Sequence, residues 1–252
     1  MGKIILIASG KGGVGKTTMT SNIAACLAKR GRKVLCFDAD LRLRNLDILL
    51  NLSDQAIFDI QDLYLNRCTF DKAHLTHELH ENLYFIPGPA ALTEDPEAVC
   101  KYLIELAKEK ESEFDYIFID CPAGVGLGFQ SLLKRGCEVI VVATPELTSM
   151  RDAEITADMA WEKGCPVRLL VNRIRPDLMR KGLAPDVDDI IDASAVQLLG
   201  IVPEDRRVLI SSGSSRLLCD MRRSLCLRAI ENISARLDGE NRELLEFNKT
   251  KA

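Results

Sequence analysis

The sequence predicts a doubly wound α/β fold, in which a mostly parallel β-sheet is flanked by helices on both sides. Three observations predict it: a glycine-rich loop directly after the first apolar run, further short apolar runs without polar alternation, and helical spacing between those runs. Unbroken apolar runs are typical of strands that are buried on both faces, as in parallel sheets. The predicted strands are residues 4–8, 34–37, 83–86, 116–119, 139–143, 167–171 and 198–202.

The first strand, the loop and the first helix follow one another without a gap. After the glycine-rich loop, Met19, Ile23 and Leu27 repeat every four residues, which is the spacing of one helix face. Gly31 is placed to end this helix, because glycine adopts the left-handed conformation that closes many helices.

The later strands alternate with further segments of helical spacing, which is the pattern of α/β folds. One such segment is opened by Pro96 after Asp95, because proline suits the first position of a helix. Its spaced residues are Ala98, Tyr102, Glu105 and Leu106. With no repeat or convincing linker before about Asp238, we expect one domain over residues 1–237 and a polar tail over residues 238–252.

Composition and charge narrow the class of protein. The chain has 252 residues, 47% of them hydrophobic and 28% charged, as in an ordinary globular protein. The net charge of −4 disfavours non-specific binding of duplex DNA, which requires a strongly basic surface. No apolar run reaches the roughly 18 residues of a spanning helix, and no signal peptide precedes the first strand. We therefore expect a cytoplasmic protein.

Nine cysteines form an odd set in which no two are separated by two residues, so metal-ligand spacing is absent. Reduced thiols are the simplest interpretation. The cysteines are Cys26, Cys36, Cys68, Cys100, Cys121, Cys137, Cys165, Cys219 and Cys226.

The three histidines, His74, His77 and His80, stand at intervals of three residues. On a helix they would share one face and suggest a metal site. A solvated surface segment before the strand at residues 83–86 is the interpretation that we favour.

The loop itself has the spacing of a phosphate-binding P-loop, with Gly10, four residues, and then Gly15-Lys16-Thr17. Backbone N–H groups of such a loop bind phosphate oxygens together with the positive end of the following helix. Lys16 and Thr17 suit the terminal phosphates and Mg²⁺. Lys11 has no obvious ligand in the same pocket, so we expect it to serve the nucleotide of another molecule. The predicted nucleotide-binding residues here are Gly10, Lys11, Gly12, Gly13, Val14, Gly15, Lys16, Thr17 and Thr18.

Three aspartates lie where the doubly wound fold places ligands, at the carboxyl ends of strands. Asp38 follows the second predicted strand, Asp40 comes two residues later, and Asp120 ends the strand at residues 116–119. Asp120 fits a Walker B position, where a carboxylate supports the water shell of Mg²⁺. Of Asp38 and Asp40, one suits holding the water shell of the metal ion and the other suits orienting the attacking water.

The segment from Gly10 to Thr18 resembles the deviant Walker A motif of the MinD/ParA family of P-loop ATPases, whose signature lysine corresponds to Lys11. The resemblance covers approximately residues 3–237 and is closest to the cell-division members. The other segments that carry it are Asp38-Ala39-Asp40, Leu43–Asp47, Asp120–Gly124, Pro145–Ser149, Arg151-Asp152, Asn172-Arg173 and Pro203–Asp205.

The resemblance implies a P-loop ATPase domain that hydrolyses ATP to ADP and phosphate with Mg²⁺. In this family ATP brings two subunits face to face, and each signature lysine reaches the phosphates of the partner. It implies catalytic roles for Lys11, Lys16 and Asp40, with Asp40 positioning the attacking water. Thr18 would contact the α-phosphate, and Asn172 would bind the adenine edge. The implied metal-site residues are Thr17, Asp38 and Asp120, and the implied wall of the base is Pro203, Glu204 and Asp205.

The resemblance also implies a cellular role: a switch that associates with the inner face of the cell membrane and places the division septum. Its implied partners are a division inhibitor of the MinC type and an activator of the MinE type or one linked to DivIVA. Alternatives are a flagellar-number regulator, a ParA-type partition ATPase and a nucleotide-dependent iron–sulfur reductase. For the last, Cys100 and Cys137 are the only candidate cluster ligands, in settings unlike that family's.

The tail departs from the family pattern of a basic amphipathic helix that binds anionic membranes. Leu244, Leu245 and Phe247 would offer a small apolar face. However, the acidic residues of the tail would oppose binding at about 1 kcal/mol per like charge near the membrane surface. We therefore expect a weak membrane-targeting helix at most. The acidic residues are Glu240, Glu243 and Glu246.

The sequence leaves the partner of Asp152 undecided. Asp152 is expected either to pair with Lys11 in the single subunit or to stay solvated near a helix N-terminus.

Overall fold

The computed structural model describes residues 2–41, 43–214 and 216–245. The strands in this part of the chain are β1 (Lys3–Ala8), β2 (Val34–Asp38), β3 (Leu75–His77), β4 (His80–Ile86), β5 (Tyr116–Asp120), β6 (Glu138–Ala143), β7 (Val167–Ile174) and β8 (Leu198–Pro203). They form one sheet in the order β3-β4-β2-β5-β1-β6-β7-β8. All neighbouring strands run parallel except β3 and β4, which are antiparallel.

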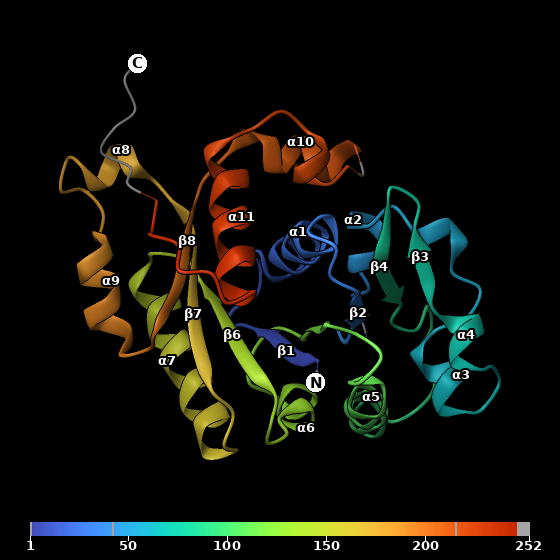
Figure 1. The fold of residues 1–252 in the computed structure, drawn as a ribbon. Helices are drawn as coiled ribbons and strands as arrows, with labels where there is room; N and C mark the ends of the chain where they lie inside the picture. The colour runs from blue at the N-terminus through green and yellow to red at the C-terminus, as the bar shows by residue number, and fades with distance from the viewer. Residues whose placement is uncertain (1, 42, 215, 246–252) are drawn as a thin grey trace.

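Helices cover both faces of this sheet (Figure 1). The α-helices are α1 (Lys16–Lys29), α2 (Leu46–Leu49), α3 (Ile60–Tyr64), α4 (Phe70–Ala73), α5 (Pro96–Lys110), α6 (Leu127–Leu132), α7 (Leu147–Glu162), α8 (Pro176–Met179), α9 (Val187–Ser194), α10 (Arg206–Ser214) and α11 (Leu225–Leu237). Two short 3₁₀ helices are η1 (Ser53–Gln55) and η2 (Leu218–Asp220). Helices α1 and α11 pack on one face, and α5, α6 and α7 pack on the other.

Strand β1 shows why the apolar runs lack alternation. Ile4 and Leu6 belong to the core under α5, α6 and α7, whereas Ile5 and Ile7 belong to the core under α1 and α11. All four are at most 1% exposed. Both faces of the strand are therefore dry, and every position favours an apolar side chain.

The predicted fold class is confirmed, and each predicted strand is present. Strand β3 was missed because it has three residues and no apolar run. The helix after the loop ends at Lys29, and Gly31 has a φ of +82°, as expected. Asp95 caps α5 by accepting a hydrogen bond from the N–H of Ala98 at 3.0 Å, with Pro96 in the first turn.

The tail beyond α11 contains no helix over residues 239–245. Leu244 and Leu245 are half-buried and pack against the two cores, instead of forming the apolar face of a helix. Arg236 fixes this segment by donating a hydrogen bond to the carbonyl oxygen of Arg242 at 2.6 Å. Phe247 lies outside the described residues.

Gly200 on β8 allows α11 to approach the sheet closely. A Cβ atom at this position would lie 2.4 Å from Cγ1 of Ile233, which is 1% exposed within the core. We expect Gly200→Ala to lower the free energy of unfolding by about 1–3 kcal/mol, because overpacking a core costs that much. Urea unfolding of both proteins measures the difference.

The matched control is Gly213→Ala near the end of α10, where a Cβ atom meets nothing within 4 Å. We expect this change to leave stability unchanged or raise it by up to about 1 kcal/mol, because alanine favours the helix. Equal losses in the two variants would contradict the close-approach explanation.

Candidate active site

The P-loop connects the end of β1 to the start of α1 at the carboxyl edge of the sheet. Gly15 precedes α1 with a φ of +100°, a left-handed conformation that favours glycine. Among the described residues no side chain caps α1, so its first N–H groups are directed to the loop. An uncapped helix start behind a glycine-rich turn is a ready site for a phosphate group.

Asn172 near the end of β7 holds the loop from the side. Its Nδ2 atom donates a hydrogen bond to the carbonyl oxygen of Val14 at 2.8 Å, and its side chain is buried. A Cβ atom at Gly15 would lie 2.4 Å from the same nitrogen. The amide that the resemblance assigns to adenine thus also requires glycine at the last position of the loop.

Asp120 ends β5 behind the loop and is 2% exposed. Its Oδ1 atom accepts a hydrogen bond from Oγ1 of Thr20 at 3.1 Å, and the Thr17 side chain is a second donor. Burial raises the pKa of this carboxyl group, although Thr17 and the buried Lys16 ammonium group oppose the rise. A carboxylate beside the threonine that would hold Mg²⁺ fits the predicted metal-supporting role. The sequence prediction missed Thr20, whose only signal was a polar residue on the apolar face of α1.

Asp38 ends β2 directly opposite Asp120 in the register of the two strands. Its carboxylate accepts three backbone hydrogen bonds at 3.0 Å each, from the N–H groups of Asp40, Asn45 and Leu46. Burial and the nearby Asp120 carboxylate raise the pKa of Asp38, whereas the three N–H groups lower it. Besides its predicted place near the metal, Asp38 therefore anchors the loop that follows β2.

Asp40 is half-buried in that loop, and its Oδ1 atom accepts a hydrogen bond from the N–H of Leu43 at 3.2 Å. It lines a hollow of about 340 Å³ together with Pro122 and Ala123, which follow β5. The segments after β2 and β5, both of which carry the family resemblance, therefore meet beside Asp40.

A second cavity, of about 600 Å³, opens beside the P-loop and brings the remaining predicted residues together. Arg175 bridges its rim by pairing with Glu204 at 3.6 Å. Met19 also lines it, although its spacing alone predicted only a core position. The predicted residues that line the cavity are Gly15, Thr18, Asn172, Pro203, Glu204 and Asp205.

Lys11 lies at the rim of the loop, and half of its side chain is exposed. Its Nζ atom is 3.6 Å from Oε2 of Glu146, the residue that precedes α7. Of the two alternatives left open for Asp152, the structure does not show the pairing with Lys11: Glu146 takes that place, and the backbone of Asp152 packs against Gly10, with its carbonyl oxygen 2.5 Å from the position of a Cβ atom there.

The cysteines and histidines lie elsewhere. All nine cysteines are free thiols, and Cys100 and Cys137 are at most 1% exposed within the core, where they cannot reach the cysteines of a partner. The predicted solvated segment of histidines is wrong: His77 at the end of β3 and His80 at the start of β4 are each 7% exposed. Their spacing suited a helix, but the segment is a hairpin.

The site therefore combines an uncapped P-loop helix, a buried aspartate behind its threonines, a cavity of about 600 Å³ beside the loop and a second lysine at the rim. These features define a P-loop ATPase of the deviant Walker A class. Residues 2–158 match the family described as an AAA domain. The chain is 38% identical to the septum site-determining protein MinD of Synechocystis sp. over 98% of this chain and 93% of the relative. It belongs to the MinD family of septum site-determining ATPases.

Further relatives agree with this assignment. The MinD of Bacillus subtilis is 38% identical over 96% of this chain and 91% of its own length. The structure of the MinD cell division protein of Aquifex aeolicus superposes with a TM-score of 0.85 at 32% identity, over 97% of this chain and 100% of that one. The MinD of Pyrococcus horikoshii, solved with Mg-ADP, has a TM-score of 0.82 at 29% identity, over 94% and 96% of the two chains.

These findings confirm the family resemblance, the ATPase class and the cell-division branch of the family. A ParA family ATPase of Chlorobium tepidum has the same fold at 24% identity and a TM-score of 0.74. Within the described residues, no helix has the length and apolar character that crossing a bilayer requires.

Proposed function

We propose that this chain is an ATP-dependent dimerisation switch for placing the division septum, and that Lys11 acts on the nucleotide of the partner subunit. The observation that carries the proposal is the position of Lys11, half-exposed at the rim of the loop while Lys16 is buried beside Asp120. This difference in exposure supports a role for Lys16 at the phosphates of its own subunit and a role for Lys11 at those of a second subunit.

The cost of moving Lys11 is small. Its partner Glu146 is 65% exposed at the side chain, and exposed ion pairs are worth about 0–1 kcal/mol. A triphosphate carries several negative charges in a site that water leaves on dimerisation, so its attraction for the ammonium group is much larger. Lys11 would then stabilise the charge that develops on the transferred phosphoryl group, as an arginine finger does.

The remaining roles follow from the positions of the side chains. Lys16 would bind the β- and γ-phosphates, and Thr18 would contact the α-phosphate. Thr17 would hold Mg²⁺, with Asp38 and Asp120 supporting it; the bound ion would neutralise phosphate oxygens. Asp40 would orient the attacking water, which suits its half-buried carboxylate in the hollow beside Pro122.

The large cavity beside the loop would hold the base. Asn172 would bind the adenine edge while its Nδ2 atom keeps the bond to Val14. Pro203, Glu204 and Asp205 would form the wall, with the pair of Glu204 and Arg175 closing the rim. The fit is supported by the size of the cavity and by its opening directly at Gly15.

The dimer would recruit other proteins. A MinC:MinD complex is known from Aquifex aeolicus, and its MinD chain superposes on this one with a TM-score of 0.86 at 33% identity. We propose a division inhibitor of the MinC type as one partner. An activator of the MinE type, or one linked to DivIVA, would be another.

Two variants separate nucleotide-driven dimerisation from hydrolysis. We expect Asp40→Ala to bind ATP and dimerise but to lose hydrolysis, because only the attacking water would lose the side chain that orients it. We expect Lys16→Ala to stay monomeric with ATP, because a ligand of the phosphates themselves is lost. Gel filtration with ATP and with ADP measures both, and a MinC-type inhibitor added to the Asp40→Ala protein should co-elute only with ATP. Hydrolysis that persists in Asp40→Ala, or a Lys16→Ala dimer, would contradict these roles.

The crossing of Lys11 between subunits is tested by complementation. We expect Lys11→Ala and Asp40→Ala each to be inactive alone. A dimer that contains one subunit of each variant has one complete site, which combines Asp40 of the Lys11→Ala subunit with Lys11 of the Asp40→Ala subunit. Random mixing in equal amounts should therefore restore about a quarter of the wild-type activity per subunit. A mixture as inactive as its two components would show that Lys11 acts within its own subunit.

We propose that membrane contact, through the tail, is peripheral, reversible and weak, because acidic residues alternate with its apolar ones. Sedimentation with anionic vesicles should pellet little of the protein, even with ATP. Truncation after Asp238 is the test variant, and truncation after Leu245 is its control, because it keeps the packed leucines in place. Strong ATP-dependent pelleting that either truncation abolishes would contradict a weak anchor.

A further inference from the structure

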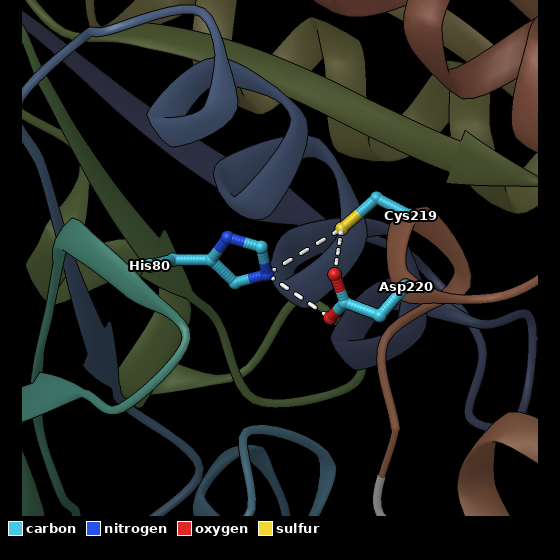
Figure 2. A group of neighbouring side chains, drawn as sticks. All are labelled: His80, Cys219 and Asp220. Atoms are coloured by element: carbon cyan, nitrogen blue, oxygen red, sulfur yellow. Dashed lines mark hydrogen bonds and ion pairs between the residues drawn. The ribbon is translucent and has the colours of Figure 1, made fainter.

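A cluster of three metal-ligating side chains lies outside the nucleotide site (Figure 2). His80 is the first residue of β4, and Cys219 and Asp220 lie in η2, between α10 and α11. The three side chains point toward one another, and one ligand atom from each lies within 4.8 Å of the others. Segments about 140 residues apart in the chain thus place an imidazole, a thiol and a carboxylate together.

The distances between these atoms are close to those along one face of a metal tetrahedron, although His80 is nearest Oδ2 of Asp220 and Cys219 is nearest Oδ1. Nε2 of His80 is 3.0 Å from Oδ2 of Asp220 and 3.6 Å from Sγ of Cys219, and that sulfur atom is 3.8 Å from Oδ1 of Asp220. A tetrahedral zinc ion with ordinary bond lengths separates N, O and S ligands by about 3.4–3.6 Å. The cluster therefore needs only small side-chain rotations to surround an ion.

The surroundings hold the ligands in position while leaving a path for an ion. The side chain of His80 is 5% exposed and that of Asp220 is 17% exposed. A hollow of about 190 Å³ reaches Asp220 from the side of His77, and another of about 260 Å³ reaches Cys219 from the side of Lys29. The ligands are thus shielded from bulk water, but each end of the cluster opens to the surface.

The backbone of η2 is fixed without any ion. Asn22 on α1 accepts a hydrogen bond from the N–H of Leu218 at 2.8 Å, and Lys29 donates one to the carbonyl oxygen of Cys219 at 2.8 Å. Cys26 on α1 lies next to Cys219 and lines the same hollow. Such contacts pre-orient the ligands, which is what outer-shell groups do around metal centres. The Lys29 ammonium group, 3.9 Å from Asp220, would move toward solvent when a cation binds.

We propose that His80, Cys219 and Asp220 bind a divalent transition metal ion of the zinc class, with water as the fourth ligand. A thiolate and an imidazole select zinc-like ions over Mg²⁺, which prefers oxygen ligands. On binding, the S–H bond of Cys219 is exchanged for a sulfur–metal bond and the proton passes to solvent, with no change in oxidation state. The ion would tie β4 to the segment between α10 and α11.

This site is separate from the proposed ATPase chemistry. It packs near the C-terminal end of α1, where Cys26 and Lys29 lie, whereas the P-loop is at the N-terminal end. A helix of 14 residues spans about 20 Å. Metal binding can therefore be tested with the nucleotide site filled, and its failure would leave the switch mechanism untouched.

The experiment uses the full chain, stripped with a chelator and titrated with Co²⁺ in the presence of Mg²⁺ and ADP. We expect one equivalent to bind with the absorption of a tetrahedral ion and a sulfur-to-cobalt charge-transfer band, and one equivalent of Zn²⁺ to displace it. Absence of that band in the wild-type protein, or binding far below one equivalent, would overturn the proposal without reference to any variant.

Variants then identify the ligands. Cys219→Ser should abolish the charge-transfer band, and His80→Gln and Asp220→Asn should each weaken Zn²⁺ binding by about tenfold or more. The matched controls are Cys68→Ser, a half-exposed thiol elsewhere, and His74→Gln, a histidine just before the same hairpin. Both controls should bind as the wild type does. Unchanged binding in the Cys219→Ser protein, or equal losses in the controls, would mean that His80 and Asp220 form only an ion pair.

Discussion

The register of β2, β5 and β1 is the constraint on which the site depends. It places Asp38 beside Asp120 at the carboxyl edge, with Ile7 of β1 on the other side of Asp120. Two buried carboxylates side by side are costly unless donors surround them. Asp38 therefore gathers backbone N–H groups from the loop after β2, and Asp120 gathers the threonines of α1. The need to satisfy these acids positions the P-loop helix and the loop containing Asp40 together.

The P-loop and the cavity beside it are likewise joined through a single side chain. Asn172 contacts the backbone of the P-loop at Val14 and also lines the cavity next to it. A substitution of Asn172 would therefore affect the P-loop directly, because it would remove the hydrogen bond to Val14. This contact explains why Asn172, a residue type common in turns, belongs to the same surface as the P-loop.

Much of the fold could be predicted because its cause is local and repeated. Strands that are buried on both faces have unbroken apolar runs, Gly31 marks the end of α1 and Pro96 marks the start of α5. The partner of Lys11 could not be predicted, because Glu146 just before α7 and Asp152 within its second turn are both near the loop, and only the three-dimensional packing distinguishes them. The burial of His77 and His80 was missed because it depends on η2, which lies about 140 residues further along the chain. Spacing within one segment carries no information about such long-range neighbours.

Leu244 and Leu245 cannot pack against the protein and enter a bilayer at the same time. Each leucine is already half-buried against the protein, so a bilayer that accepts them must first remove them from that contact. Full burial of a leucine is worth about 1.5–3 kcal/mol, and only the part not already gained on the protein would favour the lipid. If the tail does bind a membrane, the contacts that Leu244 and Leu245 already make with the protein would oppose that binding.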